Sequence, residues 1–262
     1  MAGTHFIGPN LLSYNPPAAW TPADATNIEY FWRGDSGLTY DGSNNVSSWV
    51  DSVNGLELTP GAGTSPKYVA SETSVNNQPV VNFGTVNTSE ILNNTTEQPI
   101  AANTSFFFFF VHSTTTNANG GYQIIGGAKG TLGAGGHEFL IETNHPSYAN
   151  SYTIYTYNVG NSGGATTNTG VSVSAPEVSW VGLGYNSTSG DVTFYRNGSS
   201  TSITDGSTDP DELAMCLGNY VGGGLPYYGK VAEWGFIKGS AYWDGSEGTD
   251  FATYVNTRYG IS

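Results

Sequence analysis

The sequence predicts an all-β protein whose antiparallel sheets pack as a sandwich, with one short helix at the C-terminal end. Short apolar runs alternate with clusters of Gly, Ser, Thr and Asn almost every ten residues. Aromatic residues, which favour strands, make up 13% of the sequence, whereas helix formers such as Lys, Glu and Leu are scarce. A chain of 262 residues can bury a full core without disulfides or metals, so one domain is expected.

The chain opens with a predicted arm. Residues 1–27 contain Pro9, Pro16, Pro17 and Pro22 and show no hydrophobic periodicity, which favours an extended segment over a folded element. The sandwich domain is expected at residues 28–262. Its predicted strands cover residues 28–32, 46–51, 79–83, 106–112, 122–127, 137–143, 151–159, 178–186, 191–198, 212–219 and 228–239.

One segment predicts a helix. Between residues 247 and 258, Phe251, Tyr254, Val255 and Arg258 recur at three- and four-residue spacing, and Gly260 follows as a stop. Many strands with a single helix argue against alternating strand and helix units. Antiparallel sheets are therefore expected.

The run of five phenylalanines at 106–110 places large apolar side chains on both faces of one strand. One face can enter the core of the sandwich, and something must cover the other. The sequence leaves three covers open: a loop or the N-terminal arm, a second subunit, or a ligand that uses the rings as a platform.

Charge and composition exclude several classes of function. The formal net charge is −14, with only seven Lys and Arg, so no cationic surface is available for nucleic acid or anionic lipid. The N-terminus lacks the basic and apolar regions of a signal peptide, and no segment is apolar enough to span a membrane. The single cysteine, Cys216, lies in an apolar run and is expected to be buried.

Three segments resemble a known family. They are "IEYFWRGDSGLTYDGSNNVSSWVDSVNGLEL", "VSWVGLGYNSTSGDVTFYRNGSS" and "YYGKVAEWGFIKGSAYWDGSEGTDFATYVNTRYGI". In this order they resemble the opening, the central hairpin and the closing strand and helix of concanavalin A-like, laminin-G-like jelly-roll domains, over about residues 28–262. The resemblance implies a two-sheet jelly roll. Two features of the residues support it independently: Asn197-Gly198 tolerates the positive φ of a tight turn, and Trp49, Trp180 and Trp234 lie where each strand needs a large inward anchor.

The tripeptide Arg33-Gly34-Asp35 occurs in integrin ligands on mobile loop tips. In the jelly-roll alignment it follows a buried strand at 30–32, where sheet pairing would hold its backbone. We therefore expect a structural tripeptide and no adhesion through it.

The same fold includes laminarinase-like glycoside hydrolases, which carry Glu-x-Asp-x-x-Glu or Glu-x-Asp-x-Glu on one strand. The segment "HEFLIET" offers Glu138 and Glu142 on one strand face, with Leu140 where the supporting Asp would stand. An aliphatic residue supplies neither a hydrogen bond nor charge, so the sequence predicts a protein that is not an enzyme.

A Ca²⁺ site is an open possibility, because hard oxygen ligands at alternate positions suit this ion. One acidic loop contains Asp205, Asp209, Asp211 and Glu212, and another contains Asp244 and Asp250. Solvated acidic loops explain the same residues, and no other cofactor is expected.

Glycan binding uses exposed rings that stack on sugar faces, beside polar groups that bond hydroxyls. Two Tyr-rich segments could build such a ledge, although ordinary packing also explains each ring. The candidate residues are Tyr148, Tyr155, Tyr157, Asn219, Tyr220 and Tyr227.

The combined features resemble virion proteins of bacteriophages, which implies a surface adhesion or decoration protein with weak binding of neutral glycans. The arm would dock on virion structural proteins, and a homo-oligomer is possible. The docking candidates are Phe6, Ile7, Leu11, Leu12 and Trp20. The alternatives are a secreted, extracellular bacterial carbohydrate-binding module and a laminarinase-like hydrolase.

Overall fold

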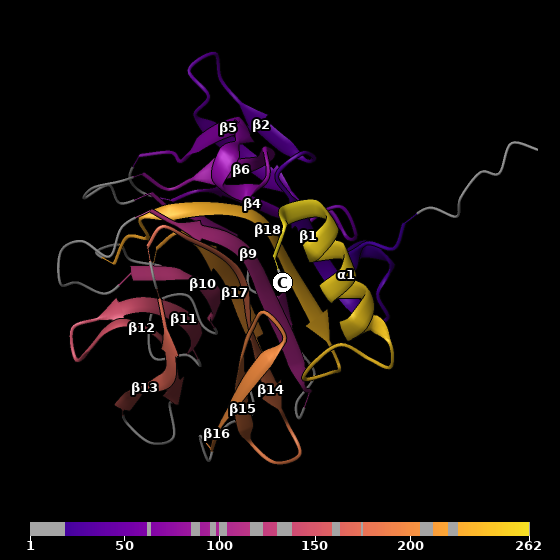
Figure 1. The fold of residues 1–262 in the computed structure, drawn as a ribbon, viewed down its shortest axis with the longest axis vertical. Coiled ribbons are helices and arrows are strands. Elements are labelled where there is room, and N and C mark those ends of the chain that lie inside the picture. The colour runs from indigo at the N-terminus through magenta and orange to yellow at the C-terminus, as the bar shows by residue number, and fades with distance from the viewer. Residues whose placement is uncertain are drawn as a thin grey trace, which may run out of the picture.

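Two antiparallel sheets face each other in the computed structural model, and one helix covers the outer face of the first sheet (Figure 1). This architecture confirms the predicted fold class. The structure describes residues 19–61, 64–84, 90–94, 98–99, 104–115, 123–129, 138–158, 163–173, 175–204, 212–219 and 225–261. No helix within these ranges has the length and apolar content needed to cross a membrane.

The first sheet is built around β9 (Phe106–Thr114), which contains the phenylalanine run and pairs on either side with β14 (Glu177–Asn186) and β18 (Gly229–Lys238). On the β14 side the order continues to β15 (Asp191–Arg196) and β16 (Ser199–Thr204), joined by the predicted Asn197-Gly198 turn. On the other side, β18 pairs with β1 (Ile28–Arg33) and with β6 (Gln78–Asn82), which is followed by β5 (Lys67–Glu72).

The second sheet runs from one edge at β13 to the other at β2, and all of its pairs are antiparallel. Its order is β13 (Gly163–Ser172), β12 (Tyr148–Asn158), β11 (Glu138–His145), β10 (Gln123–Lys129), β17 (Glu212–Leu217), β7 (Leu92–Asn93), β4 (Glu57–Pro60), β3 (Val46–Val50) and β2 (Leu38–Tyr40), while β8 (Gln98–Pro99) pairs with β17.

The main core lies between the sheets. Phe106, Phe108 and Phe110 point into it from β9, and Trp32 stacks on Trp234 with ring centroids 4.7 Å apart. Trp49 is also fully buried in this core, as expected of an inward anchor.

A second core covers the opposite face of β9 and answers the question raised by the phenylalanine run. Phe107 and Phe109 are fully buried there, under helix α1 (Glu247–Tyr259), Tyr242 and Trp243. Phe109 lies 4.7 Å from Phe251 of the helix, measured between ring centroids. The cover is therefore helix α1 together with the loop that precedes it. A loop was one of the expected covers, whereas the helix was not.

Trp180 also belongs to this second core, so the expectation that it points into the sandwich was wrong. The preceding Ser179 is the neighbour that points inward, toward His112. A one-residue difference in strand parity is enough to exchange the two faces.

The described chain begins beside the helix. Residues Pro22–Asp24 form a short 3₁₀ turn, which departs from the expected extended backbone, and the Thr26 N–H donates to Glu247 Oε1 at 2.5 Å. Residues 1–18 lie outside the described ranges, so the docking candidates Phe6, Ile7, Leu11 and Leu12 remain predictions.

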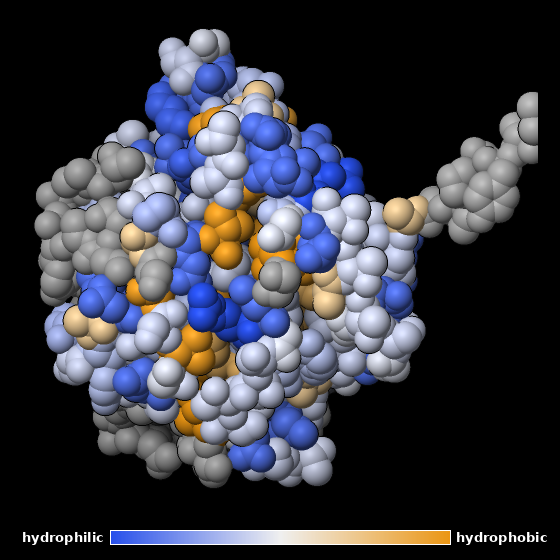
Figure 2. Space-filling view, viewed as in Figure 1, coloured by the Kyte–Doolittle hydropathy of each residue, from blue (hydrophilic) through white to orange (hydrophobic). Residues whose placement is uncertain are grey.

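The surface is mostly polar on the side shown in Figure 2, with hydrophobic residues confined to small areas near the middle. Among the residues whose side chains the structure places, the large apolar side chains that are exposed are Tyr40 and Val53. These two residues do not form a broad exposed apolar patch.

Candidate binding site

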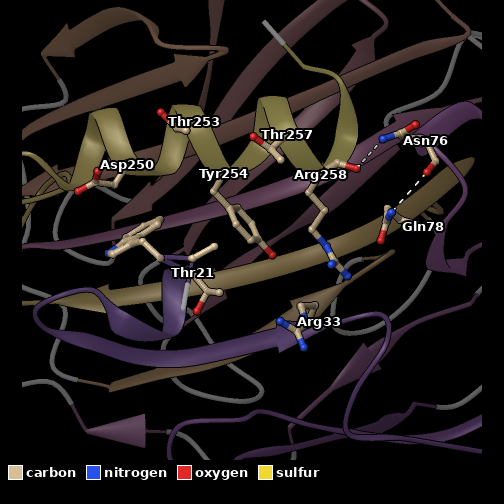
Figure 3. Close-up of a pocket in the computed structure, with 11 residues that line it drawn as sticks. Thr21, Arg33, Asn76, Gln78, Asp250, Thr253, Tyr254, Thr257 and Arg258 are labelled. Carbon is tan, nitrogen blue, oxygen red and sulfur yellow. Dashed lines mark hydrogen bonds between the residues drawn. The ribbon is translucent and has the colours of Figure 1, made fainter. Parts of the chain in front are cut away.

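A pocket of about 650 Å³ lies between helix α1, the start of the described chain and the first sheet (Figure 3). This volume is within the range of small-molecule sites. The lining residues are Ala19, Trp20, Thr21, Arg33, Asn76, Gln78, Asp250, Thr253, Tyr254, Thr257 and Arg258.

Helix α1 supplies one wall because it is amphipathic. Phe251, Val255 and Tyr259 recur every fourth residue and are buried against the sheet. The neighbouring stripe, Tyr254 and Arg258, consequently faces the pocket. Figure 3 shows both side chains extending from the helix toward the strand that carries Arg33.

Four charged groups, Arg33, Asp35, Glu233 and Arg258, meet where helix α1 faces the first sheet. Asp35, in the turn after β1, binds Arg33 Nε with one carboxylate oxygen and Arg258 Nη2, at 2.6 Å, with the other. Arg258 Nε lies 3.3 Å from Oε1 of Glu233, a residue of β18 that is completely buried. These contacts hold both guanidinium groups in fixed positions at the pocket.

Burial controls protonation in this cluster. It raises the pKa of Glu233 to about 7, although the Tyr254 and Tyr259 hydroxyls and the charge on Arg258 act in the opposite direction. Burial, and then the charge of Glu233, also raise the pKa of Tyr254. The Tyr254 hydroxyl therefore stays protonated and donates a hydrogen bond to Glu233 Oε1.

An indole ring forms another part of the wall. Trp20 is half-buried and meets Trp243 edge-on at 5.9 Å and Tyr254 edge-on at 6.4 Å, measured between ring centroids. Trp20 was expected to dock on a partner protein. The structure places it against its own chain, where two aromatic contacts orient its ring at the pocket.

Polar uncharged groups complete the lining. Asn76 Nδ2 donates to the carbonyl oxygen of Arg258 at 3.0 Å, and Gln78 Nε2 donates to the carbonyl oxygen of Asn76 at 3.4 Å (Figure 3). On the helix, Thr253 and Thr257 are exposed. A guanidinium, amides, hydroxyls and an indole ring around one hollow are the groups that recognise a polyhydroxylated ligand.

A smaller hollow of about 380 Å³ lies against α1 as well and shares Thr253 and Thr257 with the pocket. Trp180, Asn197 and Asn256 are among its other lining residues. None of its described lining residues carries a charge.

The structure does not gather the predicted Tyr ledge into one place. Tyr148 and Tyr155 are half-buried and lie seven residues apart on β12, a separation of about 23 Å in a strand. Tyr157 shares the face of Tyr155 by backbone register, opposite Glu138 and Leu140, but its side chain lies outside what the structure describes, as does the whole of Tyr220.

Asn219 and Tyr227 are fully buried, so the expectation that they lie on an exposed ledge was wrong. Asn219 Oδ1 accepts from the Leu225 N–H at 3.0 Å, which organises the chain locally. The Tyr227 hydroxyl lies 2.8 Å from His112 Nδ1 inside the sandwich.

His112 is the centre of a buried polar network that the sequence did not reveal. Its Nε2 lies 3.1 Å from the Tyr152 hydroxyl and 3.2 Å from Ser179 Oγ. The Tyr152 hydroxyl donates a hydrogen bond to Glu177 Oε1, so its oxygen accepts a hydrogen bond from His112 Nε2–H. The unprotonated Nδ1 of His112 then accepts a hydrogen bond from the Tyr227 hydroxyl. Burial lowers the pKa of His112 to about 4, so the ring is neutral.

The carboxyl pair considered for hydrolysis is only partly described. Glu142 is buried on β11, where its Oε2 accepts from Thr153 Oγ1 at 2.9 Å, and burial raises its pKa to about 7. Leu140 is buried two residues earlier, and the side chain of Glu138 lies outside the described part. A pairing of the two carboxyl groups therefore stays untested.

The acidic residues proposed for Ca²⁺ give a similar result. Asp205, Asp209 and Asp211 lie outside the described ranges, and so does the side chain of Glu212. In the other loop, Asp244 accepts from Ser240 Oγ and Asn27 Nδ2, and Asp250 accepts from Ser246 Oγ. Within the ranges searched, no three His, Cys, Asp or Glu side chains are grouped to hold a metal.

The pocket residues Arg33, Asn76, Tyr254 and Arg258 were not candidates in the sequence analysis. They come from distant positions, and the one available signal was the rarity of Arg in an acidic chain.

Neither a family model nor a curated protein matches the chain. Among solved structures, a Trypanosoma rangeli sialidase in complex with sialic acid aligns with a TM-score of 0.56 at 13% identity, over 88% of this chain and 33% of that chain. The botulinum neurotoxin type G receptor-binding domain aligns with a TM-score of 0.50 at 11% identity, over 90% and 51%. The CBM40 domain of Ruminococcus gnavus IT-sialidase is more distant, with a TM-score of 0.44 at 13% identity, over 59% and 84%.

The alignments to the sialidase and to the toxin domain agree with the two-sheet β-sandwich fold of this chain. The chain spans about a third of the sialidase and half of the toxin domain that it matches. At such low identities the likeness concerns the fold alone.

Proposed function

We propose that this protein is a non-enzymatic, lectin-like module that binds a glycan in the pocket beneath α1. The observation that carries the proposal is the combination of an oriented indole ring, Trp20, with two fixed guanidinium groups, Arg33 and Arg258, around a hollow of about 650 Å³. Rings stack on the C–H face of a sugar, while guanidinium, amide and hydroxyl groups bond its hydroxyls. The matched sialidase is in complex with a sugar, sialic acid, which supports a sugar as the kind of ligand but not a charged one.

A glycan array probed with multimerised protein tests the proposal, because one shallow site gives weak affinity that many copies raise by avidity. Hits are then measured with the monomer by titration calorimetry. Trp20→Ala should weaken binding about tenfold, a loss of 1.4 kcal/mol, with Trp20→Phe intermediate. Asn256→Ala, on the same helix but lining the smaller hollow, is the matched control and should bind like the parent.

The Tyr ledge on β12 is the competing location for the same function. If Tyr155→Ala abolishes binding and Trp20→Ala does not, the glycan site lies on the second sheet and the pocket has another role. Absence of any array signal above background for the parent would remove the glycan-binding proposal altogether.

The proposal that the protein is no enzyme rests on Leu140, which stands where hydrolases of this fold carry an Asp. Incubation with a panel of β-glucans should release no reducing sugar. Hydrolysis that disappears in Glu142→Gln would establish the laminarinase-like alternative.

We further propose that the module decorates a bacteriophage virion and that residues 1–18 attach it to virion structural proteins. The support is the resemblance of the sequence to phage surface proteins, together with an arm that carries apolar residues and no Lys, Arg, Asp or Glu. Trp20 and Pro22–Asp24 pack on the folded body, so a clean deletion removes residues 2–18 only. The shortened protein should fold and bind glycan but fail to join particles. Normal incorporation would instead favour a secreted carbohydrate-binding module.

A further inference from the structure

The charged groups of the pocket already satisfy one another. Asp35 engages both Arg33 and Arg258, and Arg258 also contacts Glu233. Each guanidinium that lines the pocket therefore has a carboxylate partner within the protein itself. A site that captures an acidic ligand needs the opposite arrangement, with a guanidinium left for the ligand to pair with.

The local balance of charge is not positive. Two guanidinium groups lie near three carboxyl groups, those of Asp35, Glu233 and Asp250, the last of which lines the pocket from the first turn of α1. Glu233 is partly protonated near neutral pH because burial raises its pKa to about 7. The pocket therefore lies between neutral and one negative charge, in a protein whose formal net charge is −14.

The hydrogen-bonding groups of the pocket suit uncharged hydroxyls. A guanidinium carries five N–H donors, more than the ion pairs to Asp35 and Glu233 use. Thr253 Oγ1 donates to the carbonyl oxygen of Thr249 and keeps its capacity to accept, and Asn76 donates through Nδ2 and keeps Oδ1 as an acceptor. The pocket therefore offers both donors and acceptors together with the Trp20 ring, as the hydroxyls of a sugar require.

We infer that the pocket beneath α1 selects an uncharged sugar and rejects the same sugar when it carries a carboxylate or sulfate. This inference rests on the glycan-binding function proposed above. The rejecting element is Asp250, the carboxylate among the described lining residues, which repels an acidic group of a ligand at short range, while Asp35 keeps Arg33 and Arg258 neutralised. The net negative charge of the protein acts in the same direction at longer range.

The test uses pairs of oligosaccharides that differ in one acidic group, such as lactose with 3′-sialyllactose, and neutral glycans from the array with their sulfated forms. Affinities are measured with the full chain by ligand-observed NMR at low and high salt. The neutral member of a bound pair should bind at least about fivefold more tightly at low salt, and the ratio should shrink at high salt as the repulsion is screened.

A charge variant tests the cause. Asp250→Asn should raise the affinity of the acidic member relative to the neutral one by about twofold or more, because it removes one carboxylate from the wall of the pocket. Glu57→Gln changes the net charge equally at an exposed position of β4 and should leave the ratio unchanged. The selection of neutral sugars is overturned if the acidic members bind more tightly. The role of Asp250 as its cause is overturned if both variants shift the ratio equally. In either case the glycan-binding proposal stands, and it fails only if no pair binds at all.

Discussion

Arg258, in the last turn of α1, donates from Nη2 to Oδ2 of Asp35 at 2.6 Å, across 223 positions of the sequence. The contact joins the C-terminal helix to the turn after β1. It also explains the Arg33-Gly34-Asp35 tripeptide, whose carboxylate is held by two arginines. A Cβ on Gly34 would lie 2.5 Å from the carbonyl oxygen of Pro79, so the turn is packed directly on the backbone of the neighbouring strand. The expectation that this tripeptide follows a buried strand is confirmed.

The energy of this contact can be measured by a double-mutant cycle with Asp35→Ala and Arg258→Ala. Both side chains are partly exposed, with 32% and 21% of their area accessible, so we expect a coupling of only about 0.5–1 kcal/mol. Arg258→Ala alone should cost more than Asp35→Ala, because it also removes the contact to the buried Glu233. Urea denaturation gives the four free energies of unfolding. A coupling of zero would mean that the pair positions the pocket without stabilising the fold.

The second core predicts a compensating pair of substitutions. Phe109→Ala should destabilise the protein by about 3–5 kcal/mol, because the ring is fully buried between β9 and α1. Gly235→Ala should cost about 1–3 kcal/mol, because its Cβ would lie 2.2 Å from the Phe109 ring. In the double variant the new methyl group enters space that the ring has left. The double variant should therefore lose less stability than the sum of the losses in the two single variants.

Urea denaturation of the parent, both single variants and the double variant measures this coupling. Val53→Ala, at an exposed position, is a control and should change the free energy of unfolding by less than about 0.5 kcal/mol. Strict additivity would show that the ring moves away from Gly235 at no cost.

The sequence predicts the central strands well and the edge strands badly. The central strands β9, β14 and β18 are strongly apolar, and their predicted bounds agree closely with the structure. The short strands β2, β4, β5, β7 and β8 were missed as well as β13 and β16. In β13 and β16 the reason is that "GGATTNTGVS" and "SSTSIT" contain few apolar residues. Both lie at the edge of their sheet, where a strand needs little burial to be held by one neighbour.

The candidate site was harder to predict for a different reason. Trp20, Arg33, Asn76 and Arg258 meet only because the chain folds, and no local pattern links them. The Tyr-rich segments do not show which rings are exposed, because a tyrosine on a strand can face solvent or a polar interior. Tyr227 faces the interior because His112 offers it a partner.

The His112 network predicts a loss of stability in acid. Burial lowers the pKa of His112 from 6.5 to about 4, so between these values the unfolded chain binds a proton that the folded protein does not. The neutral His112 ring makes its full contribution to the free energy of unfolding above pH 6.5, and this contribution should fall by about 3 kcal/mol as the pH drops to 4. His112→Gln cannot titrate and keeps an amide beside Tyr152 and Tyr227. The difference in free energy of unfolding, parent minus variant, should therefore shrink toward acid, and a constant difference would contradict the buried neutral ring.

Glu142 predicts the opposite dependence on pH. The carboxyl group lies among Ile124, Leu140 and Thr153, its neighbours within and across the strands, and Thr153 Oγ1 is its one hydrogen-bond donor among the described contacts. Burial raises its pKa from 4.5 to about 7, so between these values the folded protein binds a proton that the unfolded chain does not. Stability from the protonated carboxyl is complete below pH 4.5 and is lost as the pH rises through 7.

Glu142→Gln keeps an oxygen that can accept from Thr153 but carries no charge at any pH. The free energy of unfolding of this variant, relative to the parent, should rise by about 3 kcal/mol between pH 4 and pH 8. Taking the difference removes the contributions of His112 and Glu233, which both proteins share. Glu57→Gln, at an exposed position, should show no such trend when measured by urea denaturation at the same pH values. If the Glu142→Gln difference is the same at every pH, water or another group reaches the carboxylate, and this part of β11 is open enough to admit a ligand.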